Sequence, residues 1–200
     1  MIDEIELARR LIAGDASALD EFIEAFRGKL FQYSFLMCGH RDDAEEVAQE
    51  TLLKVFERFH QLREPEHIRA WVFRIAKNVC SLRRRKSVFA PAAELSLDEL
   101  KPVWRDAAGE RQLEIADWSA LPEDLAMRGQ IASLLQSAIA ELPDIYKSVI
   151  LLRDVEELST GETAGALEVT EDVVKTRLHR ARLAVRQKLD AALRAAREAA

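Results

Sequence analysis

Residues 159–189 read STGETAGALEVTEDVVKTRLHRARLAVRQKL, and this stretch decides the fold. The small residues of 159–167 predict a short helix, and Glu168-Val169-Thr170 predict a turn whose last residue caps the next helix. Residues 171–189 predict a longer helix, because apolar side chains recur at spacings of three and four. The apolar face comprises Val174, Leu178, Ala181, Val185 and Leu189. A short helix, a three-residue turn and a long basic helix form the helix-turn-helix arrangement.

The outer side of helix 171–189 carries candidate DNA contacts. Lys175, Thr176, His179 and Arg180 lie away from the apolar face, near the N-terminal half, where a recognition helix reads base edges. Arg177, Arg182 and Arg186 are better suited to phosphate. The alternative is a solvated basic face on an amphipathic helix, but the preceding helix and turn favour DNA binding.

A second basic helix is predicted over residues 68–86, after the polar loop 60–67. Its apolar face comprises Ile68, Trp71, Val72, Ile75, Val79 and Leu82. Its other side comprises Arg74, Lys77, Asn78, Ser81, Arg84 and Arg85. Phe59, His60 and Phe73 stand near these charges, and a cationic groove with stacking surfaces is typical of single-strand binding. Trp71 lies on the apolar stripe, so the pattern fits a core tryptophan at least as well as a stacking one.

Charge is distributed unevenly along the 200 residues. The net charge is −6, yet residues 68–86 carry +7 and residues 171–189 carry +4, which leaves −17 for the rest of the chain. Such asymmetry is what a phosphate-binding surface on an acidic protein requires.

The remaining sequence favours helices over strands. Apolar periodicity predicts helices over 3–13, 16–37, 43–59, 130–142 and 145–152, with Gly14-Asp15 breaking the first and Asp42 capping the third. Residues 87–128 lose the periodicity and contain three prolines and an excess of acids, which predicts an acidic linker. The Ala/Arg-rich tail 190–200 is expected to fray.

Composition excludes several classes of protein. No apolar run reaches the roughly 20 residues that span a membrane, and the acidic N-terminus lacks signal-peptide order, so we expect a cytoplasmic location. Cys38 and Cys80 are expected to be reduced, and the Cys-x-His formed with His40 is weak evidence for a metal. The sequence shows no nucleotide-binding glycine loop or catalytic constellation, so we expect no catalysis, metal or cofactor.

Three segments in order resemble one known family. Residues 43–51 read DAEEVAQET and resemble the DAED-x-x-QE-T/A segment of sigma region 2. Residues 71–78 read WVFRIAKN and resemble the W-L-x-R-I-A-x-N segment that follows it. Residues 174–182 read VKTRLHRAR and resemble the V-K-S-R-L-x-R-A-R recognition helix of region 4. The chain is thus similar to bacterial RNA polymerase sigma factors of the extracytoplasmic-function (ECF) type, which belong to the sigma-70 family and keep only regions 2 and 4.

The resemblance implies a fold and a function. The expected fold is all-α, with a region 2 bundle over 1–88, an acidic linker over 89–128 and a region 4 helix-turn-helix domain over 129–200. The expected function is that of a sigma factor, not an enzyme, which binds RNA polymerase core, recognises −35 and −10 promoter elements and promotes strand opening. The expected partners are the β′ clamp helices and β flap of core, promoter DNA and an anti-sigma factor.

The same resemblance assigns roles to particular residues. Contacts to core map to Asp43, Glu46, Gln49 and Glu50. Contacts to the −10 element map to Leu62, Arg74, Lys77, Asn78, Arg84 and Arg85, with Leu62 lining a base pocket. Contacts to the −35 element map to Lys175, Thr176, Arg177, His179 and Arg180.

The chain departs from the family pattern at three places. Glu46 replaces a common aspartate, loop 60–67 lacks the common F-R-G sequence, and Glu168 stands where the turn usually has glycine. The left-handed backbone conformation that this turn requires is adopted most easily by glycine.

Two other classes of protein are compatible with basic helices. One is a helix-turn-helix regulator that acts without core polymerase, and the other is an interaction protein whose basic helices are solvated or bind an acidic partner. The amide and aromatic residues of 68–86 favour the sigma-factor hypothesis over both.

Overall fold

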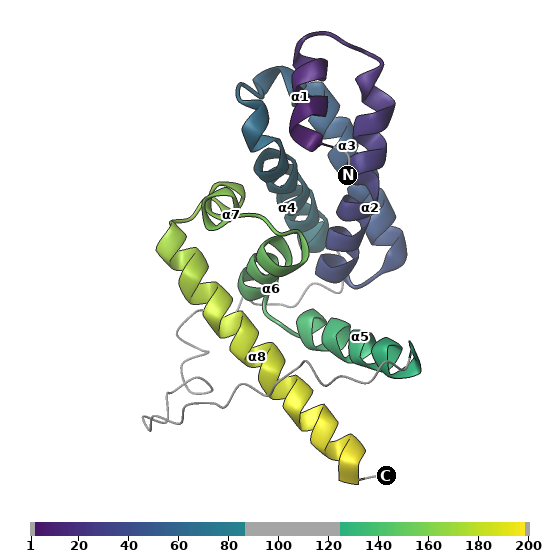
Figure 1. Ribbon diagram of the computed structural model, residues 1–200, viewed down its shortest axis with the longest axis vertical. Coiled ribbons are helices and arrows are strands. Elements are labelled where there is room, and N and C mark those ends of the chain that lie inside the picture. Colours follow the sequence, from purple (N-terminus) through teal and green to yellow (C-terminus); the bar gives the residue numbers. More distant parts are fainter. Residues whose placement is uncertain (1–2, 87–124, 199–200) are drawn as a thin grey trace.

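The computed structural model describes residues 3–86 and 125–198, and every regular element in these ranges is helical, as expected. Lobe 1 comprises α1 (Glu4–Ile12), α2 (Ala18–Cys38), α3 (Arg41–Arg58) and α4 (Ile68–Lys86), with 3-10 turns η1 (Phe59–Gln61) and η2 (Pro65–His67) before α4. Lobe 2 comprises α5 (Leu125–Ala140), α6 (Asp144–Ile150), the π-helical turn η4 (Leu151–Val155), α7 (Thr160–Leu167) and α8 (Glu171–Glu198). Figure 1 shows α7 beside α4, and α8 as a long rod that runs past α6 and α5. Most of the predicted linker lies outside the described residues.

Local sequence sets the ends of the lobe 1 helices. The Asp3 carboxylate caps α1 by accepting from the Ile5 amide at 3.0 Å. Gly14 and Gly39 adopt the left-handed backbone, with φ of 87° and 82°, and separate α1, α2 and α3. The expected cap at Asp42 is wrong: α3 begins at Arg41, so Asp42 lies inside its first turn, where its charge favours the helix dipole.

Aromatic side chains fill the centre of lobe 1. The Phe59 ring lies edge-on between Phe22, with centroids 5.9 Å apart, and Trp71, at 6.2 Å. Trp71 is only 8% exposed, so it belongs to the core. Phe73, expected near the DNA-binding charges, is also wholly buried and packs against Tyr33. Leu82, expected on the apolar face, is instead 51% exposed, because it lies near the end of α4.

Lobe 2 confirms the predicted helix-turn-helix. Ser159 and Glu162 form a reciprocal capping box at the start of α7. Glu168 ends α7 in the left-handed conformation, at φ 57° and ψ 44°, and the Thr170 hydroxyl accepts from the Val173 amide at 3.4 Å. α8 continues to Glu198, so it includes most of the tail 190–200 that was expected to fray.

The backbone strain at Glu168 gives a first prediction. A side chain in the left-handed region costs about 1–2 kcal/mol, and glycine removes that cost while adding some entropy to the unfolded chain. Glu168→Gly should therefore raise the free energy of unfolding by about 0.5–1 kcal/mol, measured by urea denaturation. Glu168→Ala is the matched control and should give no gain, because its Cβ keeps the strain. Equal stabilisation by alanine would contradict the strain argument.

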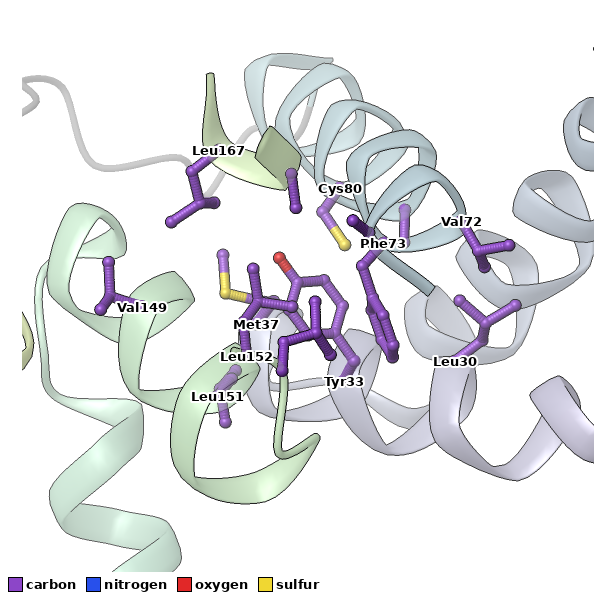
Figure 2. Close-up of a cluster of buried hydrophobic side chains, with 14 of the residues drawn as sticks. Leu30, Tyr33, Met37, Val72, Phe73, Cys80, Val149, Leu151, Leu152 and Leu167 are labelled. Atoms are coloured by element: carbon purple, nitrogen blue, oxygen red, sulfur yellow. The ribbon is translucent and has the colours of Figure 1, made fainter. Parts of the chain in front are cut away.

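The two lobes share one buried apolar cluster. Figure 2 shows Tyr33 and Met37 of α2 and Phe73 and Cys80 of α4 near Leu151 and Leu152 of η4, with Val149 and Leu167 alongside. Because all eight side chains are nearly or wholly buried, lobe 2 rests against the α2–α4 face of lobe 1.

Candidate nucleic-acid and polymerase interfaces

The outer face of α8 presents the predicted duplex-reading residues together. Lys175, Thr176, His179 and Arg180 are exposed, whereas Val174 is buried beneath them. Their spacing of one, four and five residues places them on one helical face. The face is cationic, projects from the first three turns of α8, and suits the major groove.

Three of the predicted contact residues of α8 are less free to bind DNA than the sequence suggested. The Thr176 hydroxyl donates to the Asp172 carbonyl at 2.8 Å, a bond within the helix. Arg177 is half-buried. Arg182, which the sequence suggested for phosphate, makes a two-pronged ion pair with Asp154 of η4, with nitrogen–oxygen distances of 2.9 and 2.6 Å. Arg182 thus anchors α8 to the rest of lobe 2.

A cavity of about 560 Å³ lies beside the predicted single-strand site. Leu62, Trp71 and Arg74 line it from lobe 1. Leu62 is 7% exposed and Arg74 is half-buried, and both side chains line the cavity. Ser159 and Glu162, from the start of α7, line the cavity from lobe 2. The structure thus adds lobe 2 residues to a site that sequence reasoning placed in lobe 1 alone.

The other predicted single-strand contacts are spread along α4. Asn78 is exposed and Lys77 is half-buried. Arg84 is half-buried and forms an ion pair with Asp144 of α6. The side chain of Arg85 lies outside the described residues. Leu62 and Arg74 are therefore brought together at the cavity, while Asn78 and Arg84 lie further along the helix.

The predicted polymerase-binding face lies on α3. Glu46 and Gln49 are exposed, and Asp43 and Glu50 are half-buried. Arg83 of α4 pairs with both Asp43, at 3.2 Å, and Glu46, so these acids are held in place. Because of these ion pairs, the charge of Arg83 is partly neutralised and adds less to the predicted DNA-binding charge of α4.

Sequence reasoning missed Leu53, which lies on the same face. Its side chain is 63% exposed, the largest value among the exposed large apolar residues of the described chain. Leu53 follows Glu46 by seven residues and Glu50 by three, so these side chains share one face of α3. That spacing was the available signal. An isolated apolar side chain within a polar face is a candidate anchor for a partner protein.

The two cysteines lie at the lobe 1 side of the junction. Cys38 is half-buried and Cys80 is buried, and both thiols are free. The Cys80 thiol, hydrogen-bonded to Cys38, lowers the pKa of Cys38 and has its own pKa raised. Within residues 3–86 and 125–198, no group of three potential ligands gathers to hold a metal ion. None of the helices described there is long and apolar enough to cross a membrane.

Comparisons with known proteins match the residues of both lobes to one family. Residues 22–88 match the family model of sigma-70 region 2, and residues 132–185 match that of sigma-70 region 4, together more than half of the chain. One relative is the ECF RNA polymerase sigma factor SigW of Bacillus subtilis (strain 168), which is 29% identical over 178 residues, 88% of this chain and 91% of that protein.

Two solved structures share the fold. CnrH in complex with the cytosolic domain of CnrY aligns with a TM-score of 0.63 and 21% identity, over 94% of this chain and 97% of that one. The sigma factor RpoE in complex with the anti-sigma factor NepR from Bartonella quintana aligns with a TM-score of 0.60 and 18% identity, over 86% and 96%.

The chain belongs to the sigma-70 family, and its regions 2 and 4 fall in lobes 1 and 2. It is a transcription initiation factor of the ECF type, which binds RNA polymerase core and recognises promoter DNA.

Proposed function

We propose that the chain divides promoter recognition between its two basic helices. α8 reads duplex −35 DNA through Lys175, Thr176, His179 and Arg180, with Arg177 near phosphate. The observation that carries this assignment is the exposure of all four reading residues on one face of a helix-turn-helix. The opened −10 strand is held by Arg74, Lys77, Asn78, Arg84 and Arg85, with a base entering beside Leu62. The cavity next to Leu62 and the exposed amide of Asn78 support this second assignment.

We further propose the following partners and organisation of the chain. Core polymerase docks on the α3 face formed by Asp43, Glu46, Gln49 and Glu50, with Leu53 as its apolar anchor. Region 2 extends over 1–88, the linker over 89–128 and region 4 over 129–200. The protein acts in the cytoplasm without chemistry of its own, and strand opening is driven by captured bases and polymerase contacts. An anti-sigma factor is a further proposed partner, as for the RpoE structure.

The experiment separates this function from that of a regulator that acts without core. Sheared genomic DNA is offered to the free chain, to core polymerase, and to both together at matched concentrations. Sequence-specific retention should require both proteins and should fall steeply with salt, with a log–log slope of about −0.9 per neutralised phosphate. Specific retention by the free chain alone, unchanged by core, would support the regulator instead.

Arg180 provides a prediction about duplex reading. If its exposed guanidinium reads a base edge, Arg180→Ala in holoenzyme should weaken binding to the −35 element by about 1–3 kcal/mol. Arg186→Ala, further along α8, should cost less and should cost the same on a scrambled −35 duplex. Fluorescence anisotropy on both duplexes measures the difference. Equal loss on both duplexes would show that Arg180 contacts phosphate only.

Asn78 provides a prediction about strand opening. Asn78→Ala removes an exposed amide and should slow opening at the −10 element by about tenfold, the effect of losing roughly 1.4 kcal/mol of base contact. Permanganate reactivity of unpaired thymines follows the opening. Core binding and binding to the −35 duplex should not change. A loss of core affinity would instead assign Asn78 a structural role.

A further inference from the structure

The two cysteines of the chain meet across two helices of lobe 1. Cys38 is the last residue of α2, Cys80 lies in the second half of α4, and these helices pack against each other. The Cys80 side chain points from α4 toward Tyr33 and Met37 of α2 (Figure 2). Its thiol is hydrogen-bonded to the thiol of Cys38. The fold therefore brings together two thiols that are far apart in the sequence.

The two thiols differ in their access to solvent. Cys38 is half-buried at the end of α2, immediately before the left-handed turn at Gly39, whereas Cys80 is only 1% exposed. A small solute can therefore reach the Cys38 sulfur from the surface, but it cannot reach the Cys80 sulfur directly. The buried thiol is in turn well placed to react with any group that forms on its neighbour.

The surroundings make Cys38 the more reactive of the two. The hydrogen bond with Cys80 lowers the pKa of the Cys38 thiol. The guanidinium groups of Arg84 and Arg83 lower this pKa further, whereas burial and Asp43 act against them. The same hydrogen bond, together with burial, raises the pKa of Cys80. Because the thiolate is the nucleophilic form, attack on an oxidant is expected to begin at Cys38.

We propose that Cys38 and Cys80 form a reversible redox site whose oxidant is hydrogen peroxide or a small organic hydroperoxide. The Cys38 thiol takes one oxygen atom from the hydroperoxide, which leaves as water or an alcohol, and becomes a sulfenic acid. The Cys80 thiol then attacks the Cys38 sulfur. A disulfide forms between α2 and α4, and the sulfenic hydroxyl leaves as water with the thiol proton of Cys80. A dithiol reductant restores both thiols by exchange.

The neighbouring thiol keeps the oxidation of Cys38 at a reversible stage. A sulfenic acid without such a neighbour proceeds to sulfinic and sulfonic acids, which thiol reductants do not reverse. A charged group of this kind at the half-buried Cys38 would disturb the packing of α2 on α4. Capture by Cys80 prevents that damage. This chemistry does not depend on the promoter contacts proposed for α4.

Peroxide treatment of the full chain, followed by alkylation, trypsin digestion and mass spectrometry, tests the proposal. In the wild type, peptide 30–41, which contains Cys38, should be joined to peptide 78–83, which contains Cys80. The joined species should weigh about 2 Da less than its two reduced peptides together and should disappear with dithiothreitol.

Two variants assign a role to each thiol. Cys80→Ser removes the neighbouring thiol, so Cys38 should accumulate as sulfinic and sulfonic acids that dithiothreitol does not reverse. Cys38→Ser is the matched control and should keep the Cys80 thiol unmodified, because that thiol is buried. Circular dichroism before oxidation checks that both variants keep the helix content of the wild type.

The wild-type result does not rely on the folding of either variant. Sulfinic acid at Cys38 of the wild type without the joined peptide would overturn the proposal. So would a thiol at Cys38 that is still unmodified when free glutathione in the same solution is fully oxidised. A disulfide that joins two chains, recognised by the doubled mass of the intact protein, would also contradict it.

Discussion

Leu53→Asp should weaken binding to core polymerase by about 100-fold, which corresponds to about 3 kcal/mol. Leu53 is 63% exposed in the free chain and is surrounded on its face of α3 by Glu46, Gln49 and Glu50. Burying one leucine side chain contributes about 1.5–3 kcal/mol, and an aspartate in the same interface adds the cost of desolvating a charge. Promoter-directed transcription at limiting core should fall in parallel.

Ile12→Asp is the matched control for this substitution. Ile12 is 46% exposed at the end of α1, away from the α3 face, so the same apolar-to-acid change should leave core affinity unaltered. Titration of labelled core with each variant measures the dissociation constants directly. Core affinity equal to that of the wild type in Leu53→Asp would remove the α3 face as the proposed docking site.

Glu156→Gln should make the folded chain more stable above neutral pH, with little effect in acid. Burial of Glu156 against lobe 1, with a smaller contribution from nearby Glu4, raises the pKa of its carboxyl to about 7. Lys29 of α2 and Arg69 of α4 lower this pKa but do not offset the desolvation. The folded chain therefore favours the protonated acid. Ionisation of Glu156 as the pH rises lowers the free energy of unfolding.

The size and window of this effect follow from the two pKa values. The cost of ionising Glu156 grows between its ordinary pKa of 4.5 and about 7, and it reaches about 3 kcal/mol above pH 7. Glu156→Gln should recover most of that free energy at pH 8 and little at pH 4.5, measured by urea denaturation. Glu157→Gln removes the same charge from the adjacent, exposed position and should recover little at either pH. Equal gains in both variants would show that net charge, and not burial, is responsible.

The helix-turn-helix was predictable because local rules determine it. The apolar residues of α8 recur with the helical period, so the same pattern that buries Val174 and Leu178 exposes Lys175 and Arg180. The left-handed turn at Glu168 likewise follows from the short link between α7 and α8. The position of Phe73 was not predictable in this way, because lobe 2 and Tyr33 cover a side of α4 that the isolated helix would expose.

The packing of the lobes could not be derived from periodicity. Leu151 and Leu152 were expected within a continuous apolar helix, but a π-helical turn begins there and the chain then bends at Glu157, where φ is 55°. Pairing of Arg84 with Asp144 joins residues from different lobes, and nothing in either local segment specifies the partner. Hence the sequence identified the residues proposed for DNA contact, but it did not identify the contacts between the lobes, such as that of Arg84 with Asp144.

Transcription with purified core polymerase on genomic DNA, with mapping of RNA 5′ ends, tests the central claim most directly. The account predicts a new set of start sites that appears only when this protein is added, each preceded by the same two sequence elements at a fixed spacing. Start sites identical to those of core polymerase alone would contradict it.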